Sequence, residues 1–535
     1  MEDLLQTFYG PNAGYVLDLY ERYRLDPQSV DPATRAFFEN WPPPPEAAAV
    51  APQVGAASAT PAVDESSRQA LLAHILAASS LAHSIRSRGH LGAHLDPLGS
   101  EPPGDPALLT EMHHITDADL EQLPPDVIGG HSAEGTKNAL EAIANLRAMY
   151  SGTISYEFDQ VKSPDERNWL RDAVGLQLYR LPTGREVRAK LLKRLTEIES
   201  FERFLHTTFP GQKRFSIEGT DVLVAMIDEI IGGAVKAGTR EVIIGMAHRG
   251  RLNVLAHVLQ KPYSAILSEF RHMKHEEGVP LTDTFGFGYT GDVKYHLGAE
   301  HVLDAAGEGA TVDMKIILSP NPSHLEYVNP VVEGMTRASQ ETREHAGSPD
   351  QHLDRSLPIL IHGDAAFPGE GIVAETLNLW NLKGFRVGGT IHIILNNQLG
   401  FTTEPRDYRS THFASDLAKG FAIPIIHVNA DDPEASLMAV RIAYEFRSTF
   451  HRDILVDLVG YRRWGHNEGD EPAFTQPQMY EAIRSHPTVR ALYAQRLQEA
   501  GVVTQDQATA MQKDALAELE QARREADASE WLQEQ

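Results

Sequence analysis

The chain has 535 residues and carries 74 acidic against 48 basic side chains, so its formal net charge is −26. The length predicts three to four domains, and the charge argues against a nucleic-acid-binding surface, since a phosphate backbone would be repelled. The absence of cysteine excludes a disulfide scaffold, a thiolate nucleophile and a cysteine-ligated metal centre.

The first residues, MEDLLQTFYGP, lack the basic-then-apolar pattern of a targeting peptide. No apolar run approaches the ~18 residues that a membrane helix needs. We therefore expect a cytoplasmic protein that neither enters a membrane nor binds nucleic acid.

Composition divides the first part of the chain into three stretches. Residues 1–40 contain two short amphipathic segments, and residues 41–65 form a Pro/Ala-rich stretch typical of a linker. Residues 66–210 again show the hydrophobic periodicity of helices, and polar helical stretches alternate with loops rich in Gly, Pro and Asp. This pattern predicts a mainly helical amino-terminal domain.

Residues 211–480 alternate short apolar strands with helices, which predicts an α/β domain. The strands expected are EVIIGM (241–246), MKIIL (314–318), LPILIH (357–362), TIHIIL (390–395), IPIIHV (423–428) and DILVDLVG (453–460). Apolar strands separated by helices indicate a doubly wound parallel sheet that is covered on both faces. Residues 481–535 are polar and acidic and read as a helical connector.

Polar sequences follow each expected strand. They read AHRGR, SPNPSH, GDAA, NNQLGF, NADDP and YRRWGHNE in chain order. Ligands of parallel sheets bind outside the carboxyl ends of the strands. Six such loops rich in His, Asp, Asn and Arg therefore predict one composite site.

Asp364 and Asn397 are separated by about one strand–helix–strand unit. They would then leave neighbouring parallel strands at the same edge of the sheet. A carboxylate and an amide oxygen suit Mg²⁺, which usually takes one or two protein carboxylates together with ligand phosphates. An ordinary turn and a helix cap explain either residue alone, but the pair at this spacing favours a metal–diphosphate site.

The sequence resembles the thiamine-diphosphate-dependent decarboxylating components of 2-oxoglutarate dehydrogenase complexes. The motifs that carry the resemblance are AHRGR, KYHLG, NPSHLEYVNPVVEG, IHGDAAFPGEG, NNQLGFTT, HVNADDPEA and RRWGHNEGDEP. The family implies a thiamin diphosphate-binding fold, with residues 1–40 as a partner-docking segment and 211–480 as the domain that binds the diphosphate and Mg²⁺.

The resemblance also assigns site residues, position by position. Mg²⁺ would be held by Asp364, Asn397 and the backbone carbonyl of Leu399. The cofactor would be contacted by Arg249, Ser323, Leu325, Ala365, Ala366 and His466. Four catalytic histidines would surround the substrate and the reacting carbon: His248, His296, His324 and His466.

Imidazoles suit the implied reaction, the oxidative decarboxylation of 2-oxoglutarate in the tricarboxylic acid cycle. The distal carboxylate of 2-oxoglutarate needs a cationic or donating partner, and the reaction needs proton transfers near neutral pH. The partners implied are 2-oxoglutarate, a lipoyl-bearing dihydrolipoyl succinyltransferase and, in a homodimer, a second copy of the chain. Two alternatives stay open: a component that acts on pyruvate or a branched-chain 2-oxo acid, and a non-catalytic docking module.

The sequence departs from the family at several points. Trp464 stands where the family has histidine, and EFDQV (157–161) stands where many members have Tyr-Met-His. Members also continue for several hundred residues with a domain that binds the aminopyrimidine, and nothing after residue 500 resembles it. We therefore expect the chain to need that carboxyl-terminal half of the enzyme for full activity.

Overall fold

The computed structural model describes residues 20, 22–24, 26–30, 32–39, 65–272, 296–303 and 313–533. The chain divides into two compact units, Met1–Arg68 and Gln69–Gln535. In the first unit the rings of Tyr20 and Tyr23 pack against Phe38 of helix α3 (Pro32–Glu39) at 5.3 and 5.6 Å between centroids. The finer domain boundaries predicted above stay a prediction.

The amino-terminal part of the larger unit is mainly helical, as predicted. Its helices are α4 (Glu65–Arg88), α5 (Asp117–Gln122), α6 (Ala139–Tyr150), α7 (Pro164–Gly175) and α8 (Arg185–Thr208). Side chains hydrogen-bond the first free amides of several of them, such as Thr116 before α5, Asn138 before α6 and Ser163 before α7. Local sequence thus fixes where these helices begin.

An eight-stranded sheet lies at the centre of the larger unit, in the order β1-β9-β10-β8-β7-β2-β4-β3. Its inner strands are β2 (Glu241–Met246), β4 (Met314–Leu318), β7 (Ser356–Gly363), β8 (Ile391–Asn396), β9 (Ile425–Asn429) and β10 (Ile454–Val459). These six strands pair in parallel with one another. The predicted doubly wound α/β fold and all six predicted strands are confirmed.

Two edge strands escaped prediction. They are β1 (Ile154–Glu157) and β3 (Ala299–Leu303), and each pairs antiparallel with its neighbour, β9 or β4. Both are short, and β3 alternates between half-buried and exposed residues. Neither shows the continuous apolar run that marked the inner strands, because β3 is partly exposed and β1, although buried, includes the polar residues Ser155 and Glu157.

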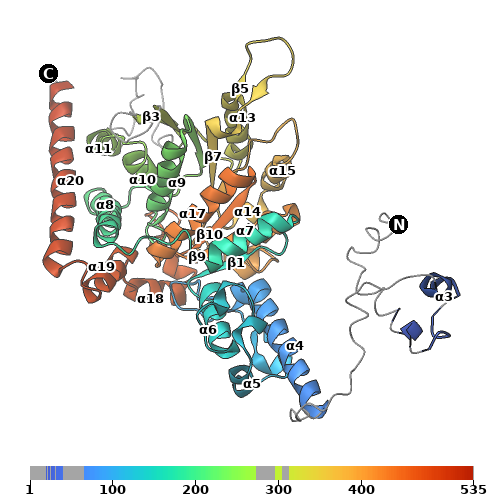
Figure 1. Cartoon of the computed structure of the whole chain (residues 1–535). Coiled ribbons are helices and arrows are strands. Elements are labelled where there is room, and N and C mark those ends of the chain that lie inside the picture. The colour runs from blue at the N-terminus through green and yellow to red at the C-terminus, as the bar shows by residue number, and fades with distance from the viewer. Residues whose placement is uncertain are drawn as a thin grey trace. The chain divides into compact units, whose positions relative to one another are not determined.

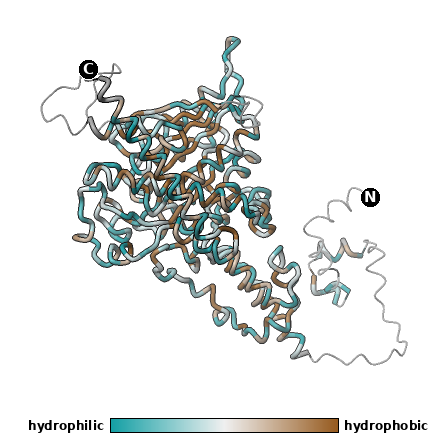
Figure 2. The backbone as a smooth tube through the Cα atoms, turned by 90° about the vertical axis from the view of Figure 1, so that its left-hand side faces the viewer, coloured by the Kyte–Doolittle hydropathy of each residue, from teal (hydrophilic) through white to brown (hydrophobic). Residues whose placement is uncertain are grey.

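Helices cover both faces of the sheet (Figure 1). One face packs against α9 (Leu223–Ala237) and α17 (Pro433–Phe450) in the largest apolar cluster, and the other packs against α13 (Val328–Gln340), α14 (Ala366–Gly369) and α15 (Gly371–Leu379). Successive strand residues such as Val242 and Ile243 alternate between these clusters. Figure 2 shows the corresponding apolar segments gathered inside the larger unit.

The remaining helices flank this α/β layer. They are α10 (Arg251–His257), α11 (Tyr263–His272), α16 (Pro405–Tyr408), α18 (Pro477–Ser485), α19 (Val489–Glu499) and α20 (Gln505–Gln533), and a small hairpin is formed by β5 (Glu341–Thr342) and β6 (Asp350–Gln351). Helix α20 runs along α8 and α11 (Figure 1). Among the described residues, no helix is both long and apolar enough to cross a membrane.

The pairing of β1 with β9 buries an ionic cluster around His427. Its Nδ1 lies 3.0 Å from Asp457 of β10 and its Nε2 2.9 Å from Glu157 of β1, while Glu157 also contacts His90 and Lys419. Burial lowers the pKa of His427, but its hydrogen bonds to Asp457 and Glu157 outweigh burial and raise the pKa to about 9. Glu157, the first residue of the segment EFDQV that departs from the family, is therefore part of a buried ion pair.

This cluster predicts a loss of stability at alkaline pH. The folded-state pKa of His427 exceeds that of the unfolded chain, so its contribution is complete below about pH 6.5 and disappears as the pH rises through about 9. A shift of this size corresponds to roughly 3 kcal/mol. Urea unfolding at pH 6 and pH 9 should show this loss in the wild type and not in His427→Gln. The control His345→Gln alters an exposed histidine between β5 and β6 and should keep the wild-type profile. A profile for His427→Gln that runs parallel to that of the wild type would contradict the assignment.

Candidate active site

A cavity of about 110 Å³ opens at the carboxyl ends of the central strands. Nine of the twelve predicted site residues line it: His248, Arg249, Leu325, Asp364, Ala365, Ala366, Asn397, Leu399 and His466. They come from the loops after β2, β4, β7, β8 and β10. One composite site therefore gathers side chains that are more than 200 residues apart in the sequence.

The loop after β9, NADDP, does not contribute to this cavity, contrary to the expectation of six loops. Asp431 instead lies 2.6 Å from His486, and Asp432 accepts a hydrogen bond from the Ala435 amide at the start of α17. Strand β9 is separated from β8 by β10, so its carboxyl end lies farther from the centre of the site.

Asp364 and Asn397 leave neighbouring parallel strands, as predicted. Strands β7 and β8 pair with Gly363 opposite Leu395, and the two polar residues follow directly. Both are buried, with 2% and 7% of their surfaces exposed. Burial raises the pKa of Asp364 to about 6, although a hydrogen bond from Tyr408 opposes this effect. A nearby cation would favour the ionised form of this carboxylate.

The donor set at this point fits Mg²⁺. Within the part of the chain that the structure describes, the Asn397 Oδ1 atom is buried without a hydrogen-bond partner, which marks it as a free oxygen ligand. The described residues contain no group of three or more His, Asp or Glu side chains that could hold a metal ion. A cation here would therefore have one carboxylate, one amide and backbone oxygen, with the remaining positions left for phosphate and water.

His248 and His466 are in edge-to-face contact in the cavity lining, with ring centroids 5.4 Å apart. Phe215 packs on His248 at 4.1 Å, and Phe401 packs on His466 at 4.8 Å. Burial, aided by the charge of Arg249, lowers the pKa of His248 to about 3 and that of His466 to about 4. Both imidazoles are therefore neutral at pH 7. Their pKa values lie below the near-neutral range expected from the sequence.

Arg249 links two segments of the site. Its Nη1 donates to the Ser216 carbonyl and its Nη2 to the His466 carbonyl, each at 3.0 Å. Burial lowers the pKa of Arg249 to about 10, so the side chain still carries its charge at neutral pH. It therefore holds the His466 loop and places a positive charge at the cavity.

Three predicted residues lie outside the cavity lining. Ser323 and His324 are exposed, and the ring of His324 contacts Tyr327 at 5.7 Å. His296 is half-buried, and its carbonyl accepts a hydrogen bond from the Asn321 amide at 3.1 Å. Their catalytic and binding roles stay predictions, as do those of the nine cavity residues.

A buried chain of polar side chains that begins at the cavity was not predicted from the sequence. Glu326 and His362 line the cavity and are 2.6 Å apart, and His362 contacts His392, which lies 3.3 Å from Asp453. The signal was present in the sequence, because His362 and His392 interrupt otherwise apolar strands. A histidine inside such a strand needs a buried partner.

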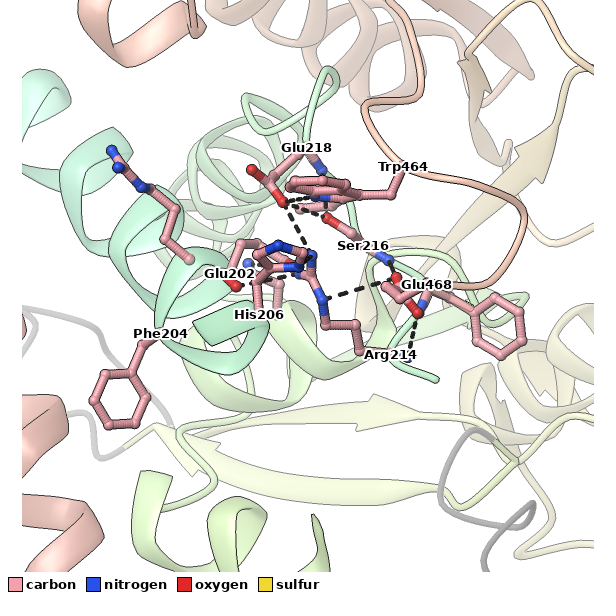
Figure 3. Close-up of polar contacts among 12 residues, drawn as sticks. Glu202, Phe204, His206, Arg214, Ser216, Glu218, Trp464 and Glu468 are labelled. Atoms are coloured by element: carbon pink, nitrogen blue, oxygen red, sulfur yellow. Dashed lines mark hydrogen bonds and ion pairs between the residues drawn. The ribbon is translucent and has the colours of Figure 1, made fainter. Parts of the chain in front are cut away.

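A second missed feature is a cluster of buried charges behind the His466 loop (Figure 3). The Arg214 side chain is 2% exposed and contacts Glu202, Glu218 at 3.2 Å and Glu468 at 3.8 Å. Glu468 also accepts hydrogen bonds from the amides of residues 214, 215 and 216, at 2.7, 3.3 and 2.9 Å. Three successive amides on one carboxylate join the segment after α8 firmly to the loop that carries His466.

Trp464, the departure noted above, belongs to this cluster. Its indole Nε1 donates to Glu218, and its ring stacks on His206 with centroids 4.0 Å apart (Figure 3). The backbone carbonyl of Trp464 accepts from Arg462 and Tyr480. Trp464 thus packs behind the active-site loop, and its side chain is absent from the cavity lining.

The comparisons with known proteins agree with this fold. The family model described as dehydrogenase E1 component matches residues 218–534. The chain therefore belongs to the dehydrogenase E1 component family. A second model, the 2-oxoglutarate dehydrogenase N-terminus, matches residues 6–45.

Among curated relatives, the chain is similar to proteins named 2-oxoglutarate dehydrogenase E1 component. It is 50% identical over 520 residues to those of Bacillus velezensis and Bacillus subtilis, which covers 97% of this chain and 54% of each relative. The Bacillus licheniformis protein is 49% identical over 525 residues, or 98% of this chain and 55% of the relative. The chain thus spans about half the length of these relatives.

Proposed function

We propose that the chain supplies the diphosphate- and cation-binding part of a thiamine diphosphate site in a 2-oxoglutarate dehydrogenase. The observation that carries the proposal is the convergence of Asp364 and Asn397, from adjacent parallel strands, on one cavity with Arg249. The similar relatives carry the name of this enzyme. The reaction would decarboxylate 2-oxoglutarate and reductively succinylate the lipoyl group of a dihydrolipoyl succinyltransferase.

The residues at the cavity have distinct tasks in this proposal. Asp364, Asn397 and the Leu399 carbonyl would hold Mg²⁺, and Arg249 would offset the negative charge of the diphosphate. The bound cofactor would supply the electron sink that permits loss of CO₂. Neutral His248 and His466 can each donate an N–H to an anionic group, and Phe215 and Phe401 shield them from water.

The proposed enzyme also needs a docking partner and a region that completes the cofactor site, which we call the completing region. A domain that binds the aminopyrimidine, as the remaining length of the relatives would provide, is needed to complete the cofactor site. Such sites lie between two domains, so we also propose a homodimer. The docking of the succinyltransferase is proposed for residues 1–40, which include most of the match to the 2-oxoglutarate dehydrogenase N-terminus.

Substrate choice tests this function most simply. Decarboxylation of 2-oxoglutarate, pyruvate and a branched-chain 2-oxo acid is compared with ferricyanide as acceptor, for the chain alone and mixed with the completing region. We expect turnover mainly in the mixture. We also expect 2-oxoglutarate to be favoured by at least about 100-fold, because the polar partner of its second carboxylate would be left unpaired by the other two acids. Faster turnover of either other acid would contradict the assignment, and full turnover by the chain alone would remove the need for a completing region.

A further inference from the structure

Tyr408 contacts the buried carboxylate of Asp364 from outside the cavity. Its hydroxyl donates a hydrogen bond to Asp364 Oδ2 at 2.5 Å, and Arg409 Nη1 donates to the same hydroxyl oxygen at 2.8 Å. Asp364 lines the cavity, whereas Tyr408 lies outside its lining. The three residues therefore form a short chain, Arg409–Tyr408–Asp364, that ends at the predicted cation ligand.

The direction of both hydrogen bonds is fixed by chemistry. Burial and the neighbouring Asp364 raise the pKa of Tyr408, so the phenol keeps its proton. Because the guanidinium of Arg409 has only donors, the phenol oxygen must accept from it. The single hydroxyl hydrogen is then left for Asp364.

The backbone around residues 400–408 is built to bring this phenol to the carboxylate. Gly400 and Thr403 exchange two hydrogen bonds, at 2.9 and 2.8 Å, across a tight turn. Helix α16 then carries Tyr408 back toward Gly400. A Cβ atom at Gly400 would lie 2.9 Å from Ala365 Cβ and 3.1 Å from the Tyr408 ring, so glycine allows the ring to approach.

We infer that Tyr408, oriented by Arg409, is a positioning residue that holds the Asp364 carboxylate in the orientation a divalent cation requires. The inference rests on the proposed function, since it deepens the account of that cation site. A cation bound through one carboxylate oxygen leaves the other oxygen free, and ligating carboxylates are commonly held by such an outer hydrogen bond. With Tyr408 on Oδ2, the remaining oxygen Oδ1 is the one available to the cation.

The test measures cation affinity with Mn²⁺ as the probe, followed by electron paramagnetic resonance in the presence of thiamine diphosphate. Tyr408→Phe keeps the ring and removes only the hydroxyl. We expect Mn²⁺ to bind this variant about 10- to 100-fold more weakly. Cation-free thermal unfolding should stay cooperative, with a midpoint lowered by only about 2–4 °C because one hydrogen bond to a buried carboxylate is lost. The control Tyr179→Phe, whose ring packs on Trp169 outside the cavity lining, should bind Mn²⁺ as the wild type does.

A double-mutant cycle separates positioning from a general effect of charge. Arg409→Met should weaken Mn²⁺ binding less than Tyr408→Phe, and the double variant should bind no more weakly than Tyr408→Phe alone. Unchanged or tighter Mn²⁺ binding by Tyr408→Phe, or fully additive losses, would overturn the inference. If the wild type itself binds no Mn²⁺ with thiamine diphosphate, with the completing region present, the proposed function fails instead.

Discussion

Replacement of Asp364 by alanine is expected to lower the Mg²⁺-dependent affinity for thiamine diphosphate by at least about 100-fold. Asp364 is the buried carboxylate in the cavity next to the free amide oxygen of Asn397. Without it, a divalent cation beside Asn397 would lose its charged ligand, and the diphosphate would lose the cation that joins it to the protein. Isothermal titration calorimetry with saturating Mg²⁺ measures the loss.

Two further variants make this expectation specific. Asp364→Asn retains the shape of the side chain but not its charge, so we expect a loss close to that of alanine. Asp514→Ala removes an exposed carboxylate from α20 and should leave the affinity unchanged. Wild-type affinity in Asp364→Ala would show that the diphosphate is held elsewhere.

Replacement of Arg214 by methionine is expected to lower the free energy of unfolding by about 3–5 kcal/mol. Arg214 is the cation among three buried glutamates, Glu202, Glu218 and Glu468, whose side chains are 2–4% exposed. Burial raises the pKa of Glu202 even with arginine present. Removal of the guanidinium leaves these carboxylates uncompensated in the interior, which is far more costly than the loss of a surface pair.

Urea unfolding compares this variant with Arg171→Met. Arg171 also pairs with a carboxylate, Asp159 at 3.2 Å, but 38% and 47% of the two side chains are exposed, so we expect a loss below about 1 kcal/mol. The buried variant should also regain stability as the pH falls from 7 to 5. Without Arg214 the glutamates bind protons more tightly in the folded than in the unfolded state, and protonation then favours folding. Equal effects of the two substitutions would contradict this account.

The sequence predicted the features that follow from periodicity and spacing. Six inner strands were visible because a parallel sheet buried on both faces requires continuous apolar runs. Asp364 and Asn397 could be paired from their positions in the chain, since a spacing of one strand–helix–strand unit places them on adjacent strands. Family motifs added Arg249, His248 and His466, all of which line the same cavity.

What escaped prediction depends on contacts between distant segments. The Arg214 cluster joins residues 202–218 to 464–468, and no local pattern in either segment reveals the other. Glu157 meets His427 only because a short edge strand pairs antiparallel with β9. Tyr408 reaches Asp364 across 44 positions through a turn that Gly400 permits. Each of these contacts is a consequence of the tertiary fold.

The pKa values of the histidines illustrate the same limit. The implied reaction suggested proton transfer by histidines near neutral pH, but burial beside Arg249 lowers the pKa of both His248 and His466. A sequence gives the type of titrating group, whereas desolvation and neighbouring charge set its pKa. The neutral imidazoles favour hydrogen-bond donation to an anionic ligand.

The most direct measurement is a calorimetric titration of the wild-type chain with thiamine diphosphate, with Mg²⁺ present and then with the cation removed by a chelator. We expect saturable binding with Mg²⁺ and a loss of affinity of at least about 100-fold without it, because Asp364 and Asn397 would hold the diphosphate through the cation. Binding that is equally tight in the chelator, or no binding even with the completing region present, would contradict a cation-dependent diphosphate site in this chain.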